Sequence, residues 1–178
     1  MSILSVFHTA SPELAHKVLT HHEDIVATLA EQGVHFARWA SGARLRPGCA
    51  EQEVLDACRV PLDGLMTERG SSGFSLLSHD GVAPALAALG EEHSLDTEEV
   101  LAMVSGRAQV SLHIGDYVYA VLCEKDDVLQ IPAGTPRWLS FGDTPFCLAL
   151  RLYADAQKAQ AKLRGEGIAG RFAGMDEL

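Results

Sequence analysis

Two short segments of the chain carry the side chains that could do chemistry. His93 and Glu99 lie six residues apart, and Gly106 follows seven residues after Glu99. The second segment, Pro-Ala-Gly-Thr-Pro-Arg, ends at Arg137. A histidine or a glutamate can move protons, and an arginine can hold a carboxylate or an enolate through its fork of donors. These residue types favour chemistry on a small molecule.

The charge balance excludes two classes of partner. The 178 residues include 14 Lys and Arg against 24 Asp and Glu, which gives a net charge of −10. Nucleic acids and anionic membranes require clustered positive charge, so neither is expected. The hydrophobic fraction of 47% is enough to build the core of a single domain spanning residues 1–178.

The cysteines and the N-terminus indicate a cytoplasmic protein. The four cysteines are widely spaced and form no C-x-x-C pair, which suits reduced thiols; they are Cys49, Cys58, Cys123 and Cys147. The first 14 residues lack a basic region and contain His8 and Pro12, so they are a poor signal peptide. The oligomeric state, monomer or small homo-oligomer, is left open.

The secondary structure that must position the chemical residues is expected to change along the chain, because the spacing of apolar residues changes. Up to about residue 70 the apolar residues have helical spacing, with one stripe at residues 25–30 and a second at residues 54–66 that ends at Gly70. Pro61 is expected to kink or split the second helix. Residues 33–39 predict a strand between the two helices.

After about residue 74 the spacing of apolar residues is typical of strands. Residues 108–114 alternate between apolar and polar, Gly115 and Asp116 form a hairpin turn, and residues 117–122, 128–131 and 146–153 predict further strands. The tail from residue 154 is expected to be helical. The predicted fold class is α+β, a β-barrel over about residues 74–153 with helices from about residues 1–70 packed on it.

The two chemical segments resemble the two cupin motifs. Residues 93–106 match most of H-x-H-x(3,4)-E-x(6)-G, and residues 132–137 match P-x-G-x-x-H except at its last position. Further segments resemble the bacterial acireductone dioxygenases over about residues 2–172; they are residues 20–25, 33–39, 91–93, 111–114, 117–125 and 168–172.

The resemblance implies a double-stranded cupin barrel with one Fe(II) or Ni(II), held by three histidines and one glutamate. Carried onto this chain, the first histidine is His93 and the glutamate is Glu99. The second histidine position is Leu95, the distal one is Arg137, and an arginine that contacts substrate in the family is Leu101. Two of four ligands are therefore replaced, so no metal and no other cofactor is expected.

The replacements predict a modified site. Arg137 is expected to take the place of the metal charge and to pair with Glu99 in the barrel interior. Glu99, His93 and Arg137 are then the predicted catalytic residues. Leu95, Leu101 and Trp138 are predicted to line a pocket for an anionic substrate with an apolar part. The Glu99–Arg137 pair also has a purely structural interpretation, as an ion pair left after the site decayed.

Three functions remain open at this point. The favoured hypothesis is a repurposed, metal-independent enzyme of the cyclase, isomerase, lyase or dehydratase type. In it Glu99 or His93 moves protons and Arg137 holds the anion. The first alternative is an active acireductone dioxygenase of methionine salvage. The second is a non-catalytic binding or regulatory protein that kept the fold.

Overall fold

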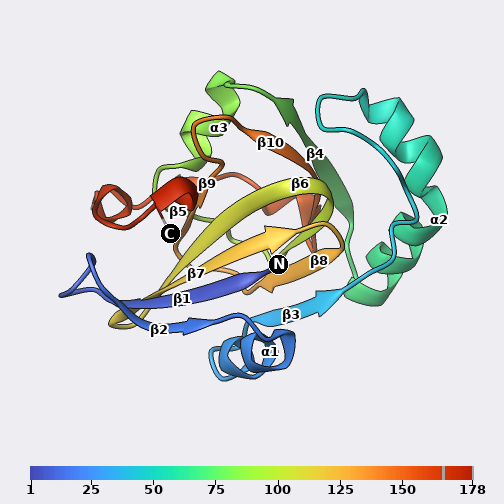
Figure 1. Ribbon diagram of the computed structural model, residues 1–178. Helices are drawn as coiled ribbons and strands as arrows, with labels where there is room; N and C mark the ends of the chain where they lie inside the picture. The colour runs from blue at the N-terminus through green and yellow to red at the C-terminus, as the bar shows by residue number, and fades with distance from the viewer. Residues whose placement is uncertain (166, 178) are drawn as a thin grey trace.

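The structure is a computed structural model that describes residues 1–165 and 167–177 (Figure 1). Its strands are β1 (Ile3–His8), β2 (Ala15–Leu19), β3 (His35–Arg38), β4 (Gly73–Asp80), β5 (His93–Ser94), β6 (Glu99–Ile114), β7 (Tyr117–Glu124), β8 (Asp127–Ile131), β9 (Arg137–Ser140), β10 (Phe146–Tyr153) and β11 (Lys162–Leu163). Its helices are α1 (His22–Ala30), α2 (Glu51–Arg69) and α3 (Pro84–Leu89), with 3-10 turns η1 (Ala156–Lys158), η2 (Ile168–Arg171) and η3 (Met175–Glu177).

Strand β6 belongs to two antiparallel sheets. The long sheet has the order β11-β5-β9-β6-β7-β1-β2, and the short sheet has the order β4-β10-β6-β8-β3. Residues 99–106 of β6 pair in the short sheet, and residues 107–114 pair in the long sheet. At the crossing point, Gly106 has φ +71°, and a Cβ there would overlap the carbonyl group of Phe146. This position therefore requires glycine.

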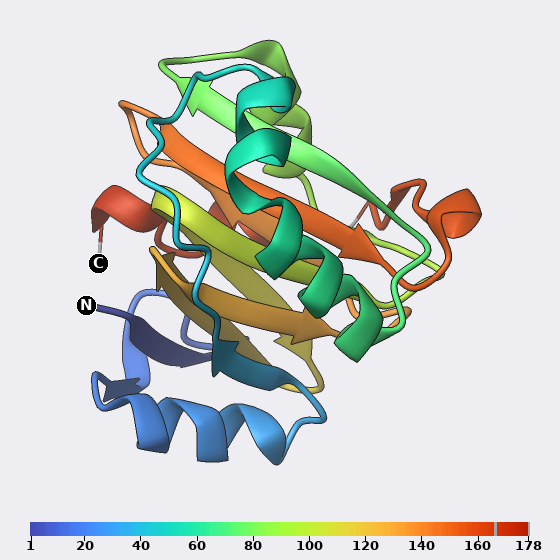
Figure 2. The same cartoon turned by 90° about the vertical axis from the view of Figure 1, so that its right-hand side faces the viewer.

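Three hydrophobic clusters lie inside and outside these sheets. The interior cluster fills the space between the sheets and includes Leu101, Met103 and Leu112. A second cluster lies under α2, which crosses the outer face of the short sheet (Figure 2). The third lies outside the long sheet, where Trp138 packs near Phe172 with ring centroids 5.9 Å apart. Alternation along each strand sends neighbouring side chains to different clusters.

The mixed helix and sheet fold predicted from the sequence is confirmed, and several elements match closely. The strand predicted at residues 146–153 is β10, and Gly115 with Asp116 joins β6 to β7. The first 70 residues are not mainly helical, however. They also contain β1, β2 and β3, and β1 and β3 pair with β7 and β8. The strand predicted at residues 33–39 is β3, whereas β1 and β2 were not predicted, because the pairing of β1 with the distant β7 is not visible in local spacing.

The expectation of a helical tail was wrong, and of the kink or split expected at Pro61 the split does not occur. Pro61 does not split α2, which runs unbroken from Glu51 to Arg69. Its four buried residues hold it on the short sheet across the proline, and this packing outweighs the lost hydrogen bond. The described part of the tail forms 3-10 turns and β11 rather than an α-helix, and residues 166 and 178 of the predicted tail lie outside the described residues. No helix in the described part of the chain has the length and apolar character needed to cross a bilayer.

Candidate active site

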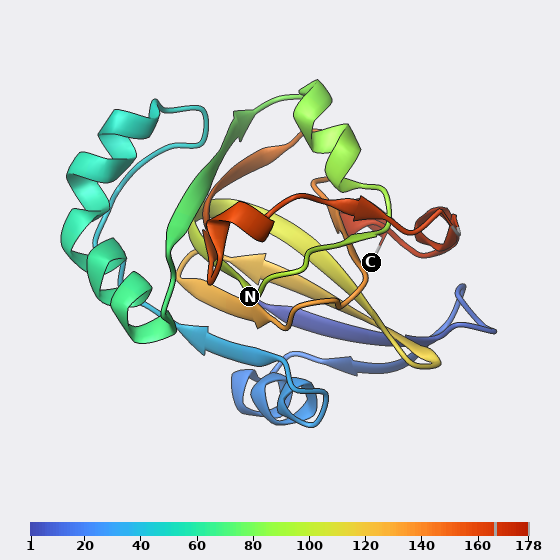
Figure 3. The ribbon, with the colours of Figure 1, turned by 180° about the vertical axis from the view of Figure 1, so that it is seen from behind.

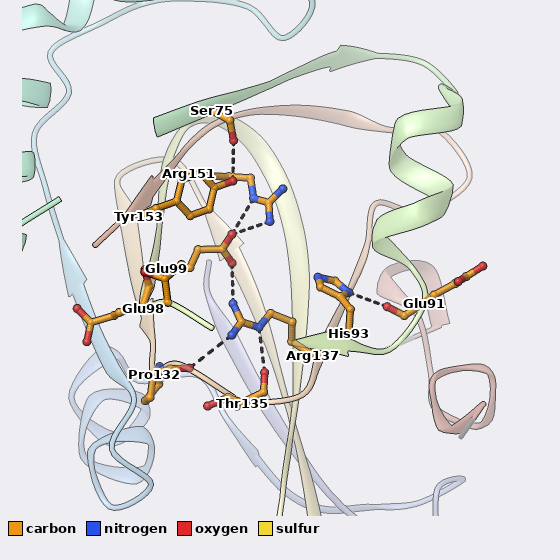
Figure 4. A network of polar contacts seen from close by, with 11 residues as sticks. Ser75, Glu91, His93, Glu98, Glu99, Pro132, Thr135, Arg137, Arg151 and Tyr153 are labelled. Atoms are coloured by element: carbon orange, nitrogen blue, oxygen red, sulfur yellow. Dashed lines mark hydrogen bonds and ion pairs between the residues drawn. The ribbon is translucent and has the colours of Figure 1, made fainter. Parts of the chain in front are cut away.

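Glu99 lies between two arginines inside the molecule (Figure 4). Its Oε1 accepts a hydrogen bond from Nη1 of Arg137 at 3.0 Å. Its Oε2 accepts from Nε of Arg151 at 2.8 Å and contacts Nη2 of Arg151 at 2.6 Å. The expected contact between Arg137 and Glu99 is therefore present, and a second guanidinium group is bound more closely than the first.

Arg137 is fixed by the loop that precedes it. Its Nε donates to the carbonyl oxygen of Thr135 at 3.1 Å, and its Nη2 donates to that of Pro132 at 3.4 Å. Arg137 is the largest of the fully buried side chains, with 0% exposure. All three of its nitrogens have partners, so the loop and Glu99 together hold the guanidinium in one orientation.

His93 lies opposite Arg137 on the paired strands β5 and β9. Its Nδ1 lies 2.7 Å from the carbonyl oxygen of Glu91, which requires a hydrogen on Nδ1. Its Nε2 is buried and has no hydrogen-bond partner in the described residues. In Figure 4 this nitrogen faces the guanidinium side of the site. The neutral ring thus presents a free acceptor atom to the interior.

The electrostatics of the cluster leave one positive charge in excess. Burial opposes ionisation of Glu99, but Arg151 and Arg137 outweigh it and hold the pKa of Glu99 below its ordinary value. Burial also lowers the pKa of His93, and the guanidinium of Arg137 adds to this. Two arginines therefore stand against one carboxylate, beside a neutral histidine. A buried excess charge favours a negatively charged ligand.

The three residues predicted to line the pocket do not all lie on the same side of the sheets. Leu95 is 1% exposed, and its carbonyl oxygen accepts from the backbone N–H of Gly134 at 2.8 Å, which joins the two motif segments. Leu101 lies in the interior cluster, opposite Arg151 on β10. Trp138 was placed in the pocket wrongly. It follows Arg137 on β9, so its side chain points to the opposite face, into the outer cluster.

Arg151 is the functional candidate that sequence reasoning missed. It comes from β10, and its guanidinium carbon lies 5.7 Å from the ring centroid of Tyr153. The hydroxyl groups of Tyr153 and Ser75 lie 2.7 Å apart, which anchors the ring. A signal was available, since Arg151 is the one charged residue within the apolar run of residues 146–153.

A C-terminal strap, defined here as residues 162–164, lies against both motif segments (Figure 3). Its β11 pairs with β5, and Lys162 forms an ion pair with Asp96. Nη2 of Arg164 donates to the carbonyl oxygen of Gly134 at 3.1 Å. His93, Glu99 and Arg137 are each at most 2% exposed. The site is therefore closed, with the strap across one side.

Comparisons with known proteins identify the family of this chain. The model of the ARD/ARD' family matches residues 9–161. An acireductone dioxygenase of Pseudomonas fluorescens strain Pf0-1 is 46% identical, over 99% of this chain and all of the relative. The chain belongs to the acireductone dioxygenase family. A second relative, the acireductone dioxygenase of Pseudomonas syringae pv. syringae, is 45% identical over the same shares of both chains.

A solved structure supports the fold of the family. The acireductone dioxygenase from Bacillus anthracis, solved with a cadmium ion in its active centre, superposes with a TM-score of 0.75. The superposition covers 89% of this chain and 95% of that one, at 17% identity. The acireductone dioxygenase fold, a cupin-type arrangement of strands with helices packed on it, is therefore the fold of this chain.

These comparisons correct two predictions made from the sequence. The repurposed cyclase, isomerase, lyase or dehydratase was the wrong choice, because relatives of 45–46% identity over the full length are named acireductone dioxygenase. The expectation of no cofactor was wrong with it, since a solved member of the family holds a metal ion in its active centre. Both predictions rested on a few replaced side chains, whereas the identity extends over the whole chain.

The donor atoms at this site differ from the four-ligand set that the family resemblance implies. His93 and Glu99 supply two donors, Leu95 supplies none, and Arg137 is a cation bonded to Glu99. In residues 1–165 and 167–177 no group of three or more His, Cys, Asp or Glu is arranged to hold a metal ion. The residues present do not fit the four-ligand set.

Proposed function

We propose that the protein catalyses the reaction for which its relatives are named, the oxidation of an acireductone by O2. The observation that carries the proposal is the 46% identity to an acireductone dioxygenase over 99% of this chain. An acireductone contains an enediol beside a carbonyl group, so loss of one proton makes it an anion. Such a substrate suits a site with one excess positive charge.

The two arginines act as the binding groups for the enediolate. Arg137 and Arg151 keep their charge at all working pH values, and Glu99 balances one of the two charges. The substrate anion balances the other. Because Arg137 is held by Thr135 and Pro132, it keeps its orientation whether the site is empty or occupied.

His93 acts as the base that removes the enediol proton. Its Nδ1 hydrogen is held by the carbonyl oxygen of Glu91, so the lone pair lies on the unpartnered Nε2. Its lowered pKa keeps the ring neutral and able to accept a proton at neutral pH. Leu95 and Leu101 supply the apolar wall beside the reacting groups.

The test is an assay of the full chain with a synthetic acireductone. Loss of substrate absorbance and uptake of O2 are measured for the protein as purified, with added Fe(II) and with added Ni(II). The rate is expected to exceed the protein-free rate in at least one of these three conditions. A rate equal to the protein-free control in all three would show that the proposed function is wrong.

Matched variants test the assigned residues. His93→Gln is expected to lower kcat by about 100-fold or more, as expected for loss of a general base. His16→Gln is the control, because His16 is an exposed histidine on β2. Arg151→Gln is expected to raise KM more than it lowers kcat, since it removes part of the binding charge. Unchanged kinetics in His93→Gln would contradict the assignment of the base.

A further inference from the structure

A hollow lies on the outer face of the short sheet, away from Glu99. It has a volume of about 460 Å³ and lies between β3 and the C-terminal half of α2. The helix side is open because Pro61 and Gly64 present little side chain there. A Cβ built on Gly64 meets no heavy atom within 4 Å. We name this hollow the α2 cleft.

Arg69 lines the α2 cleft with a charge that is incompletely compensated. Its side chain is 13% exposed, and its Nη1 donates to Oε1 of Gln130 at 2.8 Å. Its Nε is buried and has no hydrogen-bond partner in the described residues. Its carboxylate neighbour, the exposed Glu68, lies 4.0 Å away. A guanidinium buried to this extent is stabilised by a further acceptor.

The other lining residues add a second cation and an aromatic ring. Arg38 is exposed, and its Nε lies 3.8 Å from the buried Asp127. The indole N–H of Trp39 donates to the carbonyl oxygen of Met103 at 3.0 Å, which holds the ring in place. His35 lies directly opposite Gln130 in the register of β3 and β8. Two arginines and one carboxylate, that of Glu68, thus border an aromatic surface, in a chain whose net charge is −10.

We propose that the α2 cleft binds a small organic anion, in which a carboxylate or phosphate group is attached to a flat apolar ring. The anionic group binds the guanidinium of Arg69, and the ring packs on Trp39. Concave sites with an apolar surface and a few polar groups are typical of small-ligand binding. The site shares no residue with the cluster of Glu99, so this binding is separate from the proposed dioxygenase activity.

The test uses phenyl phosphate and benzoate as probes, with benzyl alcohol and benzylamine as the neutral and cationic counterparts. The chain has two tryptophans, and their indole N–H signals in NMR spectra report on different places. Trp39 lines the cleft, whereas Trp138 lies in the outer cluster of the long sheet. The anionic probes are expected to shift the Trp39 signal in a saturable way, with a Kd on the order of 1 mM.

The comparison of probes decides between the two anions and tests the proposal itself. Tighter binding of phenyl phosphate identifies phosphate as the preferred group, and tighter binding of benzoate identifies carboxylate; either result supports the proposal. Equal shifts from benzyl alcohol or benzylamine, a shift of Trp138 instead of Trp39, or no saturable shift at about 10 mM would overturn it.

Two variants locate the binding. Arg69→Gln is expected to weaken binding of phenyl phosphate by about 10-fold, while Arg59→Gln, an exposed arginine on the same helix, leaves it unchanged. Gly64→Leu keeps every charge and fills the hollow, so it should abolish binding without unfolding the helix. Binding by Gly64→Leu equal to that of the natural chain would overturn the proposal even if Arg69→Gln fails to fold.

Discussion

Arg137, which is fully buried, and Arg69, whose side chain is 13% exposed, differ in how completely they are bonded. Arg137 has partners at all three nitrogens and lies against the carboxylate of Glu99 at 3.0 Å. Arg69 has one close acceptor, Gln130, and an orphaned Nε. The first arginine lies in a closed interior, and the second lies beside an open hollow. The difference is that the fold supplies an acceptor to every nitrogen of Arg137, whereas the Nε of Arg69 has none among the described residues.

The largest expected effect concerns Arg137, the arginine whose nitrogens all have partners. Glu99→Gln leaves Arg137 and Arg151 buried without a carboxylate, so we expect a loss of about 3–5 kcal/mol in the free energy of unfolding. Urea denaturation followed by circular dichroism measures it. Glu68→Gln, at the exposed partner of Arg69, should cost less than about 1 kcal/mol. Similar losses in both variants would remove the contrast between the two arginines.

The next largest effect is expected when Arg137 is replaced by a histidine that can bind a metal ion. The double variant Leu95→His and Arg137→His restores two imidazoles to the positions that the family resemblance assigns to metal ligands. We expect it to bind Ni(II) about 100-fold more tightly than either single variant, since one ion needs both ligands. Calorimetric titration measures the affinities. Equal affinities in the single and double variants would show that these positions do not converge on one ion.

The pH dependence of stability separates Glu99 from another buried acid. The pKa of Glu99 is lowered in the fold, so its stabilising contribution is complete above about pH 4.5 and is lost as the pH falls through the lower folded value. Burial raises the pKa of Asp127, so its contribution has the opposite sign and is lost as the pH rises above about 3.8. Glu99→Gln should flatten the acid limb of a denaturation series, and Asp127→Asn should steepen it. Identical acid limbs in the two variants would contradict these signs.

The smallest expected effect concerns Gly64, which lines the α2 cleft together with Arg69. Gly64→Ala places a methyl group where no heavy atom lies within 4 Å. Because glycine in a helix interior costs up to about 1 kcal/mol relative to alanine, the variant should raise the melting temperature slightly. Differential scanning calorimetry measures the shift. A lowered melting temperature would show that the α2 cleft has no room at this position.

The sequence predicted more of the fold than of the site. Alternating apolar residues and the Gly115–Asp116 turn predict the β6–β7 hairpin because both signals are local. The contact of Arg151 with Glu99 depends instead on the register of β10 against β6, 52 residues apart in the chain. Alternation along a strand predicts that Trp138 and Arg137 point to opposite faces. The placement of Trp138 in the pocket overlooked this rule. The reaction was predicted wrongly because replaced ligands were given more weight than similarity over the whole chain.

Strand β6 has a consequence for the exchange of backbone amide hydrogens with solvent. Its 16 residues bond to β7, β8, β9 and β10 across the two sheets. No part of it can open without loss of bonding in at least one sheet, so its central amides should exchange only when the entire fold unfolds. Glu99 begins this strand, and its backbone lies between Tyr153 of β10 and Ile131 of β8. Adjustments around an incoming substrate are therefore expected from side chains rather than from the backbone of this strand.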